Sequence, residues 1–155
     1  MAFRIQGLAA EPFQHLYGLN KEALAAHGAR RVVAQSQPGY PDRIELRDAA
    51  PGEPLILLNY THLAEDSPYR ASHAIYVREG ATQRYDRIDE VPEVLRVRTL
   101  SLRAFNAKHL MVDADLAEGD GVRDTLERLL ADPRVAYVHA HYAKPGCYAA
   151  LVTRA

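Results

Sequence analysis

The 155-residue sequence contains one cysteine, no tryptophan and few lysines. Cys147 cannot form a disulfide within the chain, so we expect a protein of a reducing compartment. A single cysteine also leaves no C-x-x-C spacing, which weakens the case for a structural zinc site. The basic residues are nearly all arginine, a bias that a GC-rich genome produces without functional pressure.

The chain also lacks long apolar runs and any excess of charge. No stretch approaches the roughly 18 consecutive apolar residues of a membrane span, and the first ten residues lack the layout of a signal peptide. Lys and Arg number 19 against 20 Asp and Glu, and no basic run could follow a phosphate backbone. We therefore expect a cytoplasmic protein with neither nucleic acid nor a membrane as partner, and the oligomeric state stays open.

Sequence motifs that would name a reaction are missing as well. The chain has no nucleophile elbow, P-loop, dinucleotide fingerprint, kinase motif or H-E-x-x-H spacing. Neither a cofactor nor a reaction type, whether acyl transfer, phosphoryl transfer or redox chemistry, follows from the sequence.

What the sequence does contain is the pattern of one small folded unit. A chain of this length can bury about 68–70% of its unfolded surface, so we interpret residues 1–155 as a single domain. Alternating apolar residues on either side of turn signals predict two β-hairpins. The first pairs residues 99–105 with 110–116, and the second pairs 135–142 with 147–153.

The clearest helix follows Asp120, which we expect to cap it. Its apolar stripe consists of Val122, Leu126, Leu129 and Leu130. Hairpins combined with few, unevenly spaced helices predict an α+β fold. We expect a mixed, mainly antiparallel sheet with a few helices packed on it.

Three neighbouring segments in the middle of the chain are predicted from periodicity. Residues 43–48 alternate as a half-buried strand, with Ile44 on the buried face and Arg43 on the solvent face. Residues 55–60 are apolar on both faces, which is typical of a central strand. The polar stretch 61–72 then predicts a long loop, and long loops in compact domains are often functional.

The most reactive side chains gather in the C-terminal hairpin. His139 and His141 lie two residues apart on a strand, so both leave the same face. The pair can bind a metal ion or offer two imidazoles to an anion, but zinc needs a third protein ligand. Cys147 joins the histidines only if the turn at Lys144-Pro145-Gly146 has an odd number of residues, and the sequence leaves this open. Cys147 is also a candidate nucleophile with His141 as its base.

A second candidate region is the polar stretch that ends at His73. Arg70 offers a bidentate fork for a carboxylate or phosphate, Tyr69 an amphipathic wall, and His73 a group that titrates near neutrality. Arg103 interrupts an apolar strand, where an unpaired charge is costly. It either points at the same site or emerges on the solvent face.

Several segments occur in the same order in a known bacterial family. They are Pro38-Gly39-Tyr40-Pro41-x-Arg43, Pro51-Gly52-Glu53-x-Leu55, Ser67-Pro68-Tyr69-Arg70-Ala71-Ser72, Ile75-Tyr76-Val77-Arg78-Glu79, Leu100-Ser101-Leu102-Arg103-Ala104, and Asp132-Pro133-Arg134-Val135 through His139-x-His141 to Gly146-Cys147-Tyr148. The chain thus resembles the family catalogued as domain of unknown function 1203 over nearly its whole length. It departs from the family pattern at Asp42, where Cys is common, and at His73-Ala74, where Gly-Pro is frequent. The resemblance implies a bacterial, cytosolic, single-domain protein and implies no activity.

These residues support one leading hypothesis and two alternatives. The leading hypothesis is a site that binds or transforms a small anionic metabolite where residues 61–73 meet the C-terminal hairpin. Its ligand-binding residues would be Tyr69, Arg70, His73 and Arg103, and its catalytic candidates His139, His141 and Cys147. One alternative is a non-catalytic interaction or assembly module with exposed Tyr and Arg anchors. The other is a metal-binding protein that uses His139, His141 and one further ligand.

Overall fold

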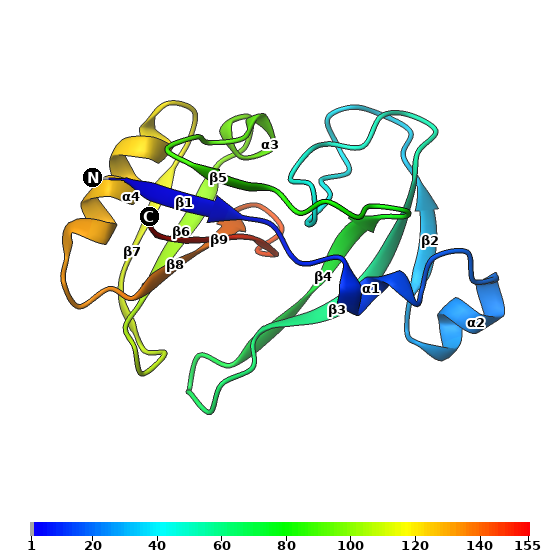
Figure 1. Ribbon diagram of the computed structural model, residues 1–155, viewed down its shortest axis with the longest axis horizontal. Coiled ribbons are helices and arrows are strands. Elements are labelled where there is room, and N and C mark those ends of the chain that lie inside the picture. Colours follow the sequence, from blue (N-terminus) through cyan, green and yellow to red (C-terminus); the bar gives the residue numbers. More distant parts are fainter. Residues whose placement is uncertain (1) are drawn as a thin grey trace.

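The computed structural model describes residues 2–155, whose nine strands form two antiparallel sheets (Figure 1). The six-stranded sheet has the order β5 (Asp86–Ile88), β1 (Phe3–Gln6), β9 (Tyr148–Arg154), β8 (Tyr137–Tyr142), β6 (Leu100–Phe105) and β7 (Met111–Ala117). The three-stranded sheet has the order β2 (Arg30–Val33), β3 (Pro54–Leu63) and β4 (Ala71–Arg78). Both predicted hairpins are present, as β6–β7 and β8–β9. The α+β prediction is confirmed.

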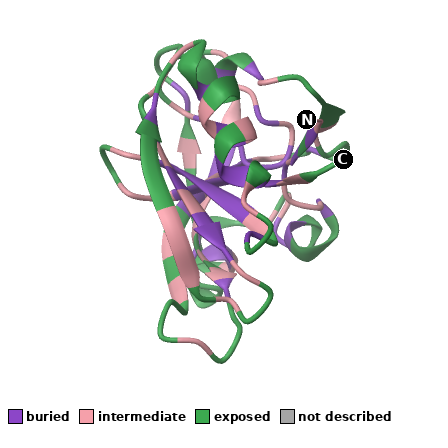
Figure 2. Cartoon of the chain, turned by 90° about the vertical axis from the view of Figure 1, so that its left-hand side faces the viewer, coloured by how far each residue is buried: buried purple, intermediate pink, exposed green. Residues whose placement is uncertain are grey.

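The six-stranded sheet is covered on one face by helix α4 (Gly121–Ala131). The predicted apolar stripe of α4 is buried against the sheet, and each such leucine stabilises the fold by about 1.5–3 kcal/mol. Figure 2 shows the buried strands beneath the helix and the exposed outer face of the helix. Contrary to expectation, the side chain of Asp120 makes no capping hydrogen bond.

The smaller sheet carries two short helices and forms a second core. These are α1 (Glu11–Gln14) and α2 (Lys21–Ala26), where the Asn20 side chain caps α2 by accepting a 2.8 Å hydrogen bond from the Ala23 amide. Phe13 and Leu24 pack with strand residues such as Ile56. A fourth helix, α3 (Glu93–Arg96), precedes β6. No helix among residues 2–155 has the length and apolar character needed to cross a membrane.

The chain passes from the first sheet to the second at Gly7. The Gly7 amide donates to the Tyr85 carbonyl at 2.9 Å, and the Leu8 amide donates to the Arg43 carbonyl at 2.8 Å. A Cβ at Gly7 would overlap the Ile44 carbonyl oxygen and lie 2.9 Å from that of Arg43. Only glycine fits this close approach of two backbones.

We predict that Gly7→Ala lowers the free energy of unfolding by more than about 2 kcal/mol, because backbone atoms cannot move away as a side chain can. Gly121→Ala is the matched control, since a Cβ there meets nothing within 4 Å. The control should leave stability unchanged or raise it by up to about 1 kcal/mol. Urea unfolding of both variants measures the difference, and equal midpoints would contradict the prediction.

The predicted strand at residues 43–48 is wrong. The segment is irregular, Leu46 has a φ of 50°, and Arg43 is only 1% exposed rather than on the solvent face. Alternation failed here because Arg43 finds carbonyl acceptors inside the protein. Its Nη1 donates to the Pro41 carbonyl at 2.6 Å and its Nε to the Tyr148 carbonyl at 2.9 Å.

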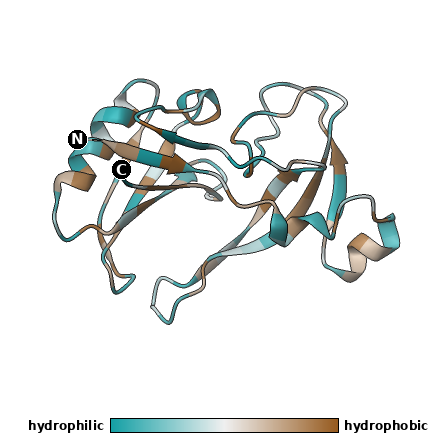
Figure 3. Ribbon diagram, viewed as in Figure 1, coloured by the Kyte–Doolittle hydropathy of each residue, from teal (hydrophilic) through white to brown (hydrophobic). Residues whose placement is uncertain are grey.

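The predicted loop at residues 61–72 is shorter than expected, because both of its ends belong to strands. β3 runs to Leu63 and β4 begins at Ala71, so only residues 64–70 form the turn. Figure 3 shows the cause of the misassignment: the hairpin is hydrophobic near β2 and becomes hydrophilic toward its tip. The polar residues of this half line the space between the two sheets, and a polar strand of that kind is easily taken for a loop.

Candidate functional site

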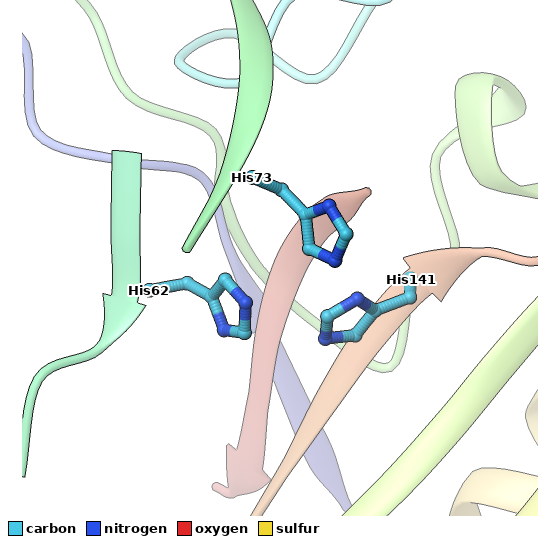
Figure 4. A group of neighbouring side chains, drawn as sticks. All are labelled: His62, His73 and His141. Atoms are coloured by element: carbon cyan, nitrogen blue, oxygen red, sulfur yellow. The ribbon is translucent and has the colours of Figure 1, made fainter. Parts of the chain in front are cut away.

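Three histidines from both sheets converge at the junction between them. His62 lies on β3, His73 on β4 and His141 on β8, and their rings point toward one another (Figure 4). One ring nitrogen of each lies within 4.8 Å of the others. We call His62, His73 and His141 the histidine trio.

Two β-bulges orient the side chains of His62 and His141. The β3–β4 register shifts between Thr61 and Leu63, which leaves His62 as the unpaired residue of a bulge. The β8–β9 register shifts between Ala140 and His141, so His141 lies opposite Tyr148. A bulge re-aims the side chains beside it and interrupts strict alternation. Both bulges therefore lie where a side chain must turn toward the junction.

Hydrogen bonding fixes one member of the trio and leaves free nitrogens in the middle. Nδ1 of His141 lies 2.9 Å from the Gly146 carbonyl oxygen. Because a carbonyl oxygen only accepts, Nδ1 carries the proton and Nε2 holds a lone pair. That Nε2 is buried without a hydrogen-bond partner, as are both ring nitrogens of His62. Buried polar atoms nearly always form hydrogen bonds, so we expect these three nitrogens to interact with a bound ion or molecule.

The environment keeps His62 and His141 uncharged. Burial, followed by electrostatic interactions with His73 and Arg103, lowers the pKa of His62 to about 4. Burial also lowers the pKa of His141 to about 3, although its hydrogen bond with Gly146 acts in the opposite direction. At neutral pH both rings are therefore neutral imidazoles, which is the form that binds metal ions.

His139 lies beside the trio and shares the face of β8 with His141. It is 6% exposed, and burial lowers its pKa to about 3. Its ring centroid is 5.7 Å from that of His62 and 5.1 Å from that of Tyr148. Nδ1 of His139 is buried without a partner. The predicted same-face pair is therefore present, but His73 and His62 rather than His139 complete the close group with His141.

Arg103 reaches the same junction from the neighbouring strand. It lies opposite His139 in the β6–β8 register, so its side chain leaves the same face as that of His139. Its Nε donates to the Ser101 hydroxyl at 3.1 Å, and no carboxylate within residues 2–155 pairs with it. Burial lowers the pKa of Arg103. The junction thus contains a cation that forms no ion pair with the described carboxylates.

The structure places Cys147 away from His141. Tyr142 and Cys147 close a four-residue turn, with the Tyr142 amide donating to the Cys147 carbonyl at 2.9 Å. Cys147 lies on the face opposite His141, where its Sγ accepts a 2.9 Å hydrogen bond from Nη2 of Arg43. This settles the turn parity that the sequence left open. His141 does not contact the thiol in the way a catalytic base would.

Tyr69 and Arg70 lie at the exposed tip of the β3–β4 hairpin. The Tyr69 ring packs edge-on against Phe105 with centroids 5.9 Å apart. The neighbouring Ser67 hydroxyl donates to the His109 carbonyl at 2.7 Å, which ties the tip to the β6–β7 turn. These residues hold the two sheets together at one end, and they are separate from the histidine trio.

Two cavities lie beside the trio. His73 lines a cavity of about 770 Å³, and His62 and His139 line a second one of about 210 Å³. A bound ion would therefore have a side open to a small molecule. His62 was not among the site residues predicted from the sequence. A predicted hairpin that paired Tyr60 with His73 would have brought His62 close to His73.

A family model described as "Protein of unknown function (DUF1203)" matches residues 39–154. The match includes all three residues of the trio and confirms the resemblance found in the sequence. Neither the curated proteins nor the solved structures contain a match to the chain.

Proposed function

We propose that this chain, which belongs to the DUF1203 family of proteins of unknown function, binds one divalent transition-metal ion through His62, His73 and His141. The observation that carries the proposal is the partnerless, buried Nε2 of His141 in the middle of the trio. Metal-binding histidines typically donate their other N–H to a carbonyl or carboxylate, which fixes the ring, and His141 does this with Gly146.

Zinc suits this donor set best. Imidazole nitrogen is a preferred zinc ligand, and two nitrogens on a tetrahedral zinc lie about 3.4 Å apart. The trio nitrogens lie within 4.8 Å of one another, so small ring rotations bring them to binding distance. Copper and nickel also accept imidazole, and the measured affinities would rank them.

Three protein ligands leave the fourth zinc position open, which is the arrangement of catalytic rather than structural sites. Zinc in such a site lowers the pKa of a bound water to about 7 and draws anions to itself. Arg103, a cation without an acid partner beside the trio, supports a small anion as the second ligand. The site would therefore activate water or bind a small anionic molecule.

The test is a calorimetric titration of untagged, chelator-treated protein with zinc. We expect one zinc per chain at saturation. The double variant His15→Ala/His27→Ala serves as the control, because both residues are exposed on the helical side of the smaller sheet. It should bind zinc as the wild type does. Binding well below one equivalent in the wild type would refute the proposal.

A small-anion site at Arg103 is tested on the zinc-loaded protein. We predict that Arg103→Gln weakens binding of inorganic phosphate by about tenfold or more, because a hydrogen bond to a charged group contributes about 1.5–3 kcal/mol. The zinc content should stay at one per chain. Arg70→Gln is the matched control, since Arg70 is exposed at the hairpin tip. Equal phosphate affinity in both variants would remove Arg103 from the site.

A further inference from the structure

The larger of the two cavities beside the trio is lined by positively charged side chains. It measures about 770 Å³ and lies between the segment that contains Arg43, strand β4 and the turn of the β8–β9 hairpin. Three cationic side chains, Arg43, Arg98 and Lys144, line it, and no acidic residue does. Its size is that of a small-molecule site.

Tyr142 lines the same cavity and lies next to two of the cations. The guanidinium carbon of Arg43 lies 5.0 Å from the centroid of its ring, and that of Arg98 lies 5.1 Å away. Its hydroxyl is buried and has no hydrogen-bond partner. Burial raises the pKa of Tyr142 to about 12, with the two arginines acting in the opposite direction. The hydroxyl is therefore uncharged, and its proton is free to form a hydrogen bond with a ligand.

Only one of the three cations, Arg98, forms an ion pair among the described residues. Arg98 forms a 2.6 Å ion pair with Asp48, which does not line the cavity. Arg43 is 1% exposed, and its hydrogen-bond acceptors are two carbonyl oxygens and the Cys147 sulfur. Neither Arg43 nor Lys144 has a carboxylate partner within residues 2–155. A buried guanidinium without an anion is costly, and Arg43 still has N–H groups to donate.

Apolar side chains line another part of the cavity wall. Leu57, Tyr76, Val97 and Pro145 line it together with the cationic residues. A ligand that matched this surface would carry an anionic group at one end and an apolar body at the other.

We propose that this cavity binds a small organic anion whose carboxylate or phosphate group accepts hydrogen bonds from Tyr142, Arg43 and Lys144. The apolar body of the ligand packs against Leu57 and Val97. His73 lines the same cavity, so the bound molecule lies next to one residue of the trio. The proposal does not depend on the metal, because every group that holds the anion comes from the protein. Arg103 does not line this cavity, so the site is separate from the phosphate position proposed at Arg103.

The test is calorimetric titration of chelator-treated protein with phenylacetate, phenyl phosphate and inorganic phosphate. Phenylacetamide is the control ligand, because it has the same apolar body as phenylacetate without the charge. We expect at least one of the two aromatic anions to bind at least tenfold more tightly than phenylacetamide. The tighter of the two identifies the preferred head group, and inorganic phosphate should bind more weakly than phenyl phosphate. Equal affinity for phenylacetamide, or no binding of either aromatic anion, would overturn the proposal.

Two variants locate the binding at this wall. Tyr142→Phe should raise the dissociation constant about tenfold without lowering the melting temperature, because its hydroxyl has no partner in the free protein. Lys144→Ala should raise it about fivefold to tenfold, while Lys108→Ala, an exposed lysine in the β6–β7 turn, should not. Unchanged affinity in both cavity variants would overturn the assignment.

The single cysteine reports on the same cavity independently. Cys147 lines the cavity, so a bound anion should slow its alkylation by uncharged iodoacetamide. Unaltered alkylation at saturating ligand would place the anion elsewhere and contradict the proposal. Because all of these measurements use metal-free protein, their failure would leave the zinc titration unaffected, and failure of the zinc titration would leave them unaffected.

Discussion

Zinc is expected to raise the melting temperature of the chelator-treated protein by about 10 °C. A ligand that binds only the folded state stabilises it by about 4.1 kcal/mol when its free concentration is 1,000 times the dissociation constant. For a chain of this size each kcal/mol corresponds to about 2–4 °C. The trio exists only in the folded chain, because His141 and the His62–His73 pair belong to different sheets.

Replacing His141 with alanine should abolish most of this zinc effect. The substitution removes the nitrogen that Gly146 orients and leaves two ligands, which is too few for a tight zinc site. His15→Ala is the control, because His15 is exposed and is not one of the trio residues. Differential scanning fluorimetry with and without zinc measures the shift. An equal zinc shift in His141→Ala and wild type would exclude His141 as a ligand.

Acid is expected to destabilise the metal-free protein strongly between pH 7.5 and pH 5. Burial lowers the pKa of His139 and of His141 to about 3, whereas an unfolded histidine titrates near 6.5. Below pH 6.5 the unfolded chain takes up protons that the folded chain does not. The stability that these residues contribute is therefore complete above about pH 6.5 and is lost as the pH falls toward 3. At pH 5 the loss is about 2 kcal/mol for each histidine.

Urea unfolding at the two pH values measures this loss. His139→Leu should remove about a third of it, because leucine keeps an apolar side chain in the buried position and does not titrate, whereas His62 and His141 still do. His27→Gln should leave the pH dependence unchanged, since His27 is exposed. Equal unfolding free energies at pH 5 and pH 7.5 in the wild type would show that the histidines are not held uncharged by burial.

The hairpins and the main helix were predictable because their signals are local. The alternation in residues 99–116 indicates two strands, and the turn between them makes each the partner of the other. The apolar stripe from Val122 to Leu130 indicates a helix and the face that it buries. The same-face placement of His139 and His141 follows from the period of a strand and is present in the structure. That one domain spans the whole chain stays a prediction.

The site itself depends on contacts that a periodicity argument does not include. The bulge at His62 and the one beside His141 redirect side chains, and neither leaves a signal in the sequence. Arg43 was placed on the solvent face because it alternates with Ile44, yet its acceptors come from Pro41 and from the distant Tyr148. Polar strand ends between two sheets resemble loops when the second sheet is unknown, which is why residues 61–63 and 71–72 were predicted as loop.

The most direct test of the account is the zinc content of four single variants. His62→Ala, His73→Ala and His141→Ala should each bind well below one equivalent after dialysis against zinc, because each removes one of the three ligands. His139→Leu should retain one equivalent. Loss of zinc in His139→Leu, combined with full zinc in His73→Ala, would instead assign the metal to the His139–His141 pair and contradict the trio.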